Sequence, residues 1–158
     1  MRVAIQPCGD SVAQAHYIDT IKHLVPSERV RPFLDAQQLA AFDRACGDAT
    51  AVWGVTPGKT GQNKKKWSKL RVGDIALLYR NKKIFSQGRI VLCIHNEALA
   101  VDLWSRTADG VTWEYLYFMD DLQEIDVSVD QYNAALDYAA NNIVQGFQVH
   151  EDVNRPGF

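Results

Sequence analysis

The chain has 158 residues, of which 47% are hydrophobic and 23% charged, and its net charge is −2. This length and composition are typical of one globular domain that buries a core. Its apolar runs are much shorter than a membrane span and no secretory leader pattern opens the chain, so we expect neither membrane insertion nor secretion. Three cysteines without metal or disulfide spacing favour a reducing cytoplasm and a protein with no metal or cofactor.

The N-terminal part of the sequence predicts one strand followed by helices. The run at residues 2–5 is typical of a strand, and an amphipathic helical stretch follows it and ends at Pro26. A second helix is expected to stop at Gly47. We therefore expect residues 1–49 to form a strand and a helical lead-in packed on the rest of the chain.

Three short patterns have the spacing of a capping box, in which two side chains satisfy free N–H groups at the start of a helix. They are Ser11 with Gln14, Asp35 with Gln38, and Ser128 with Gln131.

From Thr50 onward the pattern changes to short β-rich runs. These runs are residues 50–55, 73–79, 84–96, 112–119 and 145–150. Residues 56–67 are expected to be a loop, 97–104 a helix or loop, and Gly88 a bulge that bends the sheet. No regular alternation of strands and helices appears, so residues 50–158 predict an α+β unit around a curved, mainly antiparallel β-barrel with flanking helices.

Positive charge is concentrated in one segment. Residues 59–83 hold nine of the 17 basic residues and one acidic residue, so this segment carries +8 and the remainder −10. Such a field favours a polyanionic partner, although a solvated lysine-rich loop is the simpler alternative. The side chains expected to contact a nucleic-acid backbone are Lys59, Lys64, Lys65, Lys66, Lys69, Arg80, Lys82 and Lys83.

Catalytic patterns are weak by comparison. Cys93 and His95 share one face of a predicted strand and could form a nucleophile pair, but no third residue orients them. The triplet Gly58-Lys59-Thr60 lacks the earlier glycine of a phosphate loop, because Trp53 stands there. The four histidines have no metal-ligand spacing, so no catalytic and no metal-binding residue is assigned.

Aromatic residues, in contrast, gather in the β-rich part of the chain, which holds all four tryptophans. Most of them are expected to be core. Trp67 differs, because it follows three consecutive lysines in a polar stretch. An aromatic ring among positive charges is typical of a site that stacks on a base and binds its phosphates.

These runs together resemble the PUA-like superfamily, in particular the EVE and YTH-like domains of modification-dependent restriction endonucleases. The resemblance rests on AVWGVTPGK, WSKLRVGDIALLY, IFSQGRI, WEYLYF and YNAALDY, and it extends upstream to AHYIDTIKHLVPSERVRPFL. It implies a pseudo-barrel whose aromatic pocket accepts one extruded modified base, without catalysis. The base would be methylated or hydroxymethylated cytosine, or methylated adenine, in DNA.

The resemblance also implies which residues line that pocket. The expected pocket residues are Trp53, Thr56, Trp67, Tyr79, Phe85, Trp104 and Asp120. The lysine–serine pair of YTH domains has no counterpart, since Thr56 and Pro57 stand there, which argues against N6-methyladenosine in RNA. An RNA-binding PUA-like accessory module remains the alternative. No nuclease motif is present, so any nuclease or other effector domain is expected elsewhere in a full-length protein, unless the chain is a stand-alone reader.

Overall fold

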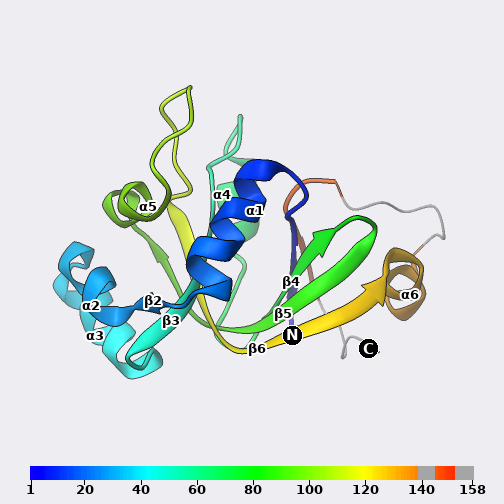
Figure 1. Cartoon of the computed structure of the whole chain (residues 1–158), viewed down its shortest axis with the longest axis horizontal. Coiled ribbons are helices and arrows are strands. Elements are labelled where there is room, and N and C mark those ends of the chain that lie inside the picture. Colours follow the sequence, from blue (N-terminus) through cyan, green and yellow to red (C-terminus); the bar gives the residue numbers. More distant parts are fainter. Residues whose placement is uncertain (139–144, 152–158) are drawn as a thin grey trace.

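The structure is a computed structural model that describes residues 1–138 and 145–151. These residues form one seven-stranded sheet with helices on both faces (Figure 1). The strands are β1 (Val3–Pro7), β2 (Val25–Pro26), β3 (Ala49–Val55), β4 (Ile75–Arg80), β5 (Lys83–His95), β6 (Tyr115–Ser128) and β7 (Gln148–His150).

The helices alternate irregularly with these strands. They are α1 (Ser11–Tyr17), the π-helix η1 (Ile18–Lys22), α2 (Ser27–Val30), the 3-10 helix η2 (Arg31–Phe33), α3 (Ala36–Ala45), α4 (Gln62–Trp67), α5 (Glu97–Trp104) and α6 (Val129–Ala135). Within the described ranges, no helix is long and apolar enough to cross a membrane.

The strand order β2-β3-β6-β5-β4-β1-β7 confirms an α+β fold with a mainly antiparallel sheet. Among the described strands, only β1 and β4 run parallel. The expected barrel is not closed, because the edge strands β2 and β7 have two and three residues and do not pair with each other. The N-terminal segment is more than a lead-in, since β1 lies inside the sheet between β4 and β7.

The sheet bends where β5 and β6 change register. One of these shifts lies between Gln87 and Arg89, which confirms the bulge expected at Gly88. A Cβ atom on Gly88 would lie 2.7 Å from Leu122 and 3.0 Å from the sulfur of Met119. The absence of a side chain therefore allows β6 to fold closely over β5 at this bend.

The two faces of the sheet bury different clusters, as alternation along β3 requires. Trp53 packs in the cluster that includes residues of α1, η1 and α4, whereas Val52 packs in the cluster of α2, α3 and α5. A third cluster joins β1, β4, β5 and β6 to α6.

Three expectations about local structure are corrected. The lysine run forms helix α4 instead of a loop, because Gly61 at its N-cap takes a left-handed φ of 77° that turns the chain into the helix. The first capping box is absent: Asp10, not Ser11, caps α1, and Gln14 donates to the Gly9 carbonyl. The boxes at Asp35–Gln38 and Ser128–Gln131 are confirmed.

The first helical stretch also ends earlier than Pro26. Its π-helical turn stops at Lys22, His23 is extended, and Val25 and Pro26 pair with β3. Val25 and Pro26, which the sequence pattern assigned to the end of a helix, therefore form a short strand that pairs with the start of β3.

Gly54 sets how closely the loop after α5 approaches β3. A Cβ atom at Gly54 would overlap the carbonyl oxygen of Trp113 and lie 2.8 Å from the ring of Trp104. Backbone atoms cannot move aside as the end of a flexible side chain can, so only glycine fits at this position.

We expect Gly54→Ala to lower the free energy of unfolding by about 1–3 kcal/mol, the usual cost of overpacking a close contact. The measurement is urea unfolding followed by circular dichroism. Gly47→Ala is the control, since nothing lies within 4 Å of its added Cβ and its φ is not left-handed. Equal unfolding free energies for the two variants would show that the loop does not pack on Gly54.

Candidate functional site

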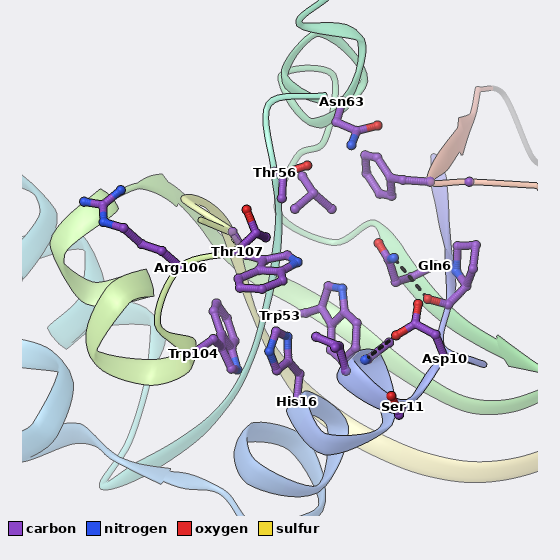
Figure 2. A pocket seen from close by; sticks show the side chains of 18 of the residues that line it. Gln6, Asp10, Ser11, His16, Trp53, Thr56, Asn63, Trp104, Arg106 and Thr107 are labelled. Carbon is purple, nitrogen blue, oxygen red and sulfur yellow. Dashed lines mark hydrogen bonds between the residues drawn. The ribbon is translucent and has the colours of Figure 1, made fainter. Parts of the chain in front are cut away.

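A cavity of about 800 Å³ opens where several distant segments meet (Figure 2). Its walls come from the end of β1, the first turns of α1, the second half of β3, the start of α4, and residues 104–113. Gly146 and Phe147, just before β7, complete the lining. The cavity thus lies between the end of β1 and the second half of β3, two strands that are not neighbours in the sheet.

Helix α1 and η1 are fixed against β3 by one buried hydrogen bond. The hydroxyl of Thr20 donates to the carbonyl of Val52 at 2.6 Å. His16 lies one helical turn before Thr20, and its side chain therefore reaches the cavity floor beside Trp53.

Four aromatic rings form the floor and one wall of the cavity. The His16 ring stacks on Trp104 at 5.3 Å with planes 27° apart, and meets Trp113 edge-on at 4.4 Å. The ring centroids of Trp53 and His16 lie 6.4 Å apart. Burial lowers the pKa of His16, so the imidazole is neutral at pH 7 and belongs to an apolar aromatic surface.

The loop between α5 and β6 is held in place by its own polar groups. Arg106 donates to the Gly110 carbonyl at 3.0 Å and to the Glu97 carboxylate at 2.7 Å, and Thr112 donates to the Ser105 carbonyl at 2.8 Å. These bonds keep the wall of the cavity on the α5 side in a defined position.

Polar side chains surround the aromatic surface. Gln6, Asp10, Thr56, Asn63 and Arg106 line the cavity, and Figure 2 shows them distributed around Trp53 and His16. The cavity therefore combines flat apolar rings with hydrogen-bonding groups, as the pocket of an aromatic ligand with a polar edge requires.

Three of the expected pocket residues come together here, namely Trp53, Thr56 and Trp104. Trp67 does not line this cavity. Its indole N–H donates to the Leu116 carbonyl at 3.0 Å and its ring packs on Tyr115 at 5.1 Å, so it anchors α4 to β6.

Tyr79, Phe85 and Asp120 also lie outside the cavity lining. Tyr79 packs against the cluster beneath α6, and the Phe85 ring contacts Tyr17 at 5.1 Å. Asp120 accepts two hydrogen bonds from Arg89 at 2.8 and 2.7 Å, and these bonds lower the pKa of its carboxyl group. It lines a separate hollow of about 420 Å³ beside α3.

Sequence reasoning missed several lining residues, among them Gln6, Asp10, His16 and Trp113. Trp113 could have been included as the remaining tryptophan of the β-rich half. His16 shares one side of its helix with Thr20, and two polar residues on a buried helix face are an available signal. Gln6 and Asp10 have no such signal, because they approach β3 only in the folded chain.

The basic residues differ in how far they are already paired. Lys66 donates to the Phe147 carbonyl at 2.9 Å, Lys69 lies 3.5 Å from Glu151, and Lys83 lies 3.2 Å from Asp126. Arg80 lies over the Phe85 ring at 4.1 Å. No ion pair of Lys59, Lys64, Lys65 or Lys82 is found among the described residues.

The Cys93 and His95 pair lacks the features of a nucleophile and base. Burial raises the pKa of Cys93 to about 12, whereas a nucleophilic cysteine needs a lowered value. His95 contacts Glu114 at 2.8 Å and stacks on Tyr115. In the part of the chain that the structure describes, no cluster of side chains could hold a metal ion.

No family model matches the chain, and no curated protein matches its sequence. Among solved structures it is similar to the N-terminal domain of McrB from Thermococcus gammatolerans bound to m5C DNA, with a TM-score of 0.63 and 17% identity over 89% of this chain and 85% of that chain. The two chains share a fold. The expected resemblance is thereby confirmed at the level of the fold.

We expect nuclear magnetic resonance titration to place the His16 midpoint below 6.5, its ordinary value. Because the unfolded state binds the proton more readily, His16 should stabilise the fold fully above pH 6.5 and lose that contribution as the pH falls below it. A His16 midpoint at or above 6.5 would show that this ring is not buried among the tryptophans.

Proposed function

We propose that this chain is a non-catalytic module that recognises a modified base in DNA. The carrying observation is the cavity whose surface is built from Trp53, Trp104, Trp113 and a neutral His16. The fold shared with a domain bound to m5C DNA supports methylated DNA as the ligand and methylcytosine as the first base to test.

The base would enter the cavity by flipping out of the duplex. A stacked base cannot reach a pocket, and extruding it costs about a few kcal/mol. Stacking on aromatic side chains returns roughly 1–3 kcal/mol per base, so several rings around one base offset that cost. Burial of a methyl group adds about 0.8 kcal/mol to the binding free energy. The cavity walls must pack closely around the methyl group for this contribution to be gained.

Helix α4 would bind the phosphates beside the flipped base. Asn63, in its first turn, lines the cavity, while the next residues, Lys64 and Lys65, are exposed and part of the basic segment. This arrangement supports a division of roles, with lysines holding the backbone and the cavity reading the base. A nuclease or other effector domain outside this chain would then act on the bound DNA.

Trp113→Ala should remove the preference for the modified base, because it takes away one aromatic wall while leaving the phosphate contacts intact. The measurement is fluorescence anisotropy with pairs of duplexes that differ only by methylation of one cytosine or one adenine. We expect the parent to prefer a methylated duplex and the variant to bind both members within about threefold, since one stacking wall contributes roughly 1–3 kcal/mol. Phe33→Ala, at a partly buried aromatic residue outside the cavity lining, is the control and should keep the preference.

Two results would refute this function. One is equal affinity of the parent protein for both members of every pair. The other is a folded Trp113→Ala protein that discriminates as sharply as the parent, which would place recognition outside this cavity.

Replacing both Lys64 and Lys65 by alanine should weaken binding to methylated and unmethylated duplexes by the same factor. In a plot of the logarithm of the binding constant against the logarithm of the salt concentration, the slope should become less steep by about 0.9 for each phosphate that the variant no longer neutralises. Lys22→Ala, an exposed lysine on η1, is the control and should leave the slope unchanged. An unchanged slope in the double variant would exclude α4 from the phosphate contacts.

A further inference from the structure

Some residues that line the cavity carry buried polar atoms that have no partner among the described residues. Two of them are the side-chain carbonyl oxygen Oε1 of Gln6 and the indole nitrogen Nε1 of Trp53. A buried polar atom without a hydrogen bond is costly, and native proteins keep few of them. Because both residues line the same cavity, these atoms mark where a ligand would supply hydrogen bonds.

The chemical role of each atom is fixed. Gln6 Nε2 donates to the Pro7 carbonyl at 3.2 Å, and a carbonyl can only accept, so the amide nitrogen must face Pro7 and Oε1 must be the free atom. Oε1 can only accept a hydrogen bond, and the Trp53 indole N–H can only donate one. In Figure 2 the amide of Gln6 points toward the part of the cavity that Trp53 lines.

An acceptor and a donor from the lining of one cavity match the two groups on the edge of cytosine. Cytosine presents an amino group, which donates, next to an unprotonated ring nitrogen, which accepts. Thymine presents the reverse, a carbonyl oxygen next to a ring N–H, and would leave both Gln6 and Trp53 unpaired.

Rejection of thymine is a requirement that methylcytosine recognition imposes. Thymine carries a methyl group on the same ring carbon as 5-methylcytosine, and ordinary DNA contains it throughout. Aromatic walls and a space for the methyl group cannot separate the two bases. A site that hydrogen-bonds the edge can, because the wrong base leaves buried groups without partners.

We propose that Gln6, together with the Trp53 N–H, is the specificity-determining residue that reads the edge of a flipped methylcytosine and rejects thymine. This inference rests on the proposed function. Gln6 comes from the end of β1 and Trp53 from β3, which are not neighbours in the sheet, so the pair is assembled only in the folded chain.

The test uses three duplexes that differ at one position, where 5-methylcytosine, cytosine or thymine stands opposite guanine. A mismatched base is extruded more easily than a paired one, so weaker binding of the thymine duplex cannot come from the cost of flipping. We expect the parent protein to bind the methylcytosine duplex at least about tenfold more tightly than the thymine duplex.

Gln6→Met keeps the length of the side chain and removes the acceptor, so its methylcytosine-to-thymine ratio should fall to within about threefold. Gln14→Met is the matched control, since Gln14 also donates to a backbone carbonyl nearby but does not line the cavity. Circular dichroism and thermal unfolding establish that each variant is folded.

Each outcome decides the matter. A parent that prefers methylcytosine over cytosine but binds thymine equally well, or a Gln6→Met protein with the parent's ratio, overturns the inference and leaves the proposed function standing. A parent protein that prefers only methylated adenine also overturns the inference and leaves the proposed function standing. A parent with no preference for any methylated duplex overturns the proposed function and this inference with it.

Discussion

The architecture depends on what covers the free edge of β3. From Ala51 onward β3 pairs with β6 on one side only, since β2 reaches no further than Thr50. A buried carbonyl on an open edge needs a partner, and Thr20 of η1 supplies it at Val52. A helix thus stands where another strand would close the barrel. The first turns of α1, the end of β1 and the second half of β3 then enclose the cavity.

The aromatic surface in that space is costly for a folded chain to keep. The indole N–H groups of Trp53 and Trp104 find no hydrogen-bond partner in the described part of the chain, although both side chains are over nine-tenths buried. Close packing alone would favour filling the cavity or pairing these groups. Instead, the absence of a side chain at Gly54 allows the loop that carries Trp113 to approach β3. The local packing thus preserves a hollow lined with rings.

Much of the sheet follows from local sequence signals, and the cavity does not. Short β-rich runs predicted the strands around Trp53 and Ile90. The capping boxes at Asp35 and Ser128 were correct, whereas the same spacing at Ser11 did not form one. Trp67 looked exposed from its lysine neighbours, yet a tertiary hydrogen bond to Leu116 holds it inside. The cavity draws on segments from residues 6 to 147, and no local pattern reports which of them meet.

Helix α4 links the charge of this protein to its cavity. Its first turn supplies Asn63 to the lining, and its last residue, Trp67, is tied to the carbonyl of Leu116 in β6. Lys66 adds a bond to the carbonyl of Phe147, another lining residue. The last turn of the helix is therefore held against β6 and the segment before β7, and the exposed Lys64 and Lys65 lie in that same short helix. A polyanion bound by these lysines would therefore lie at a defined distance from the aromatic surface. Lysines on a flexible loop would attract a polyanion but would not fix its position relative to that surface.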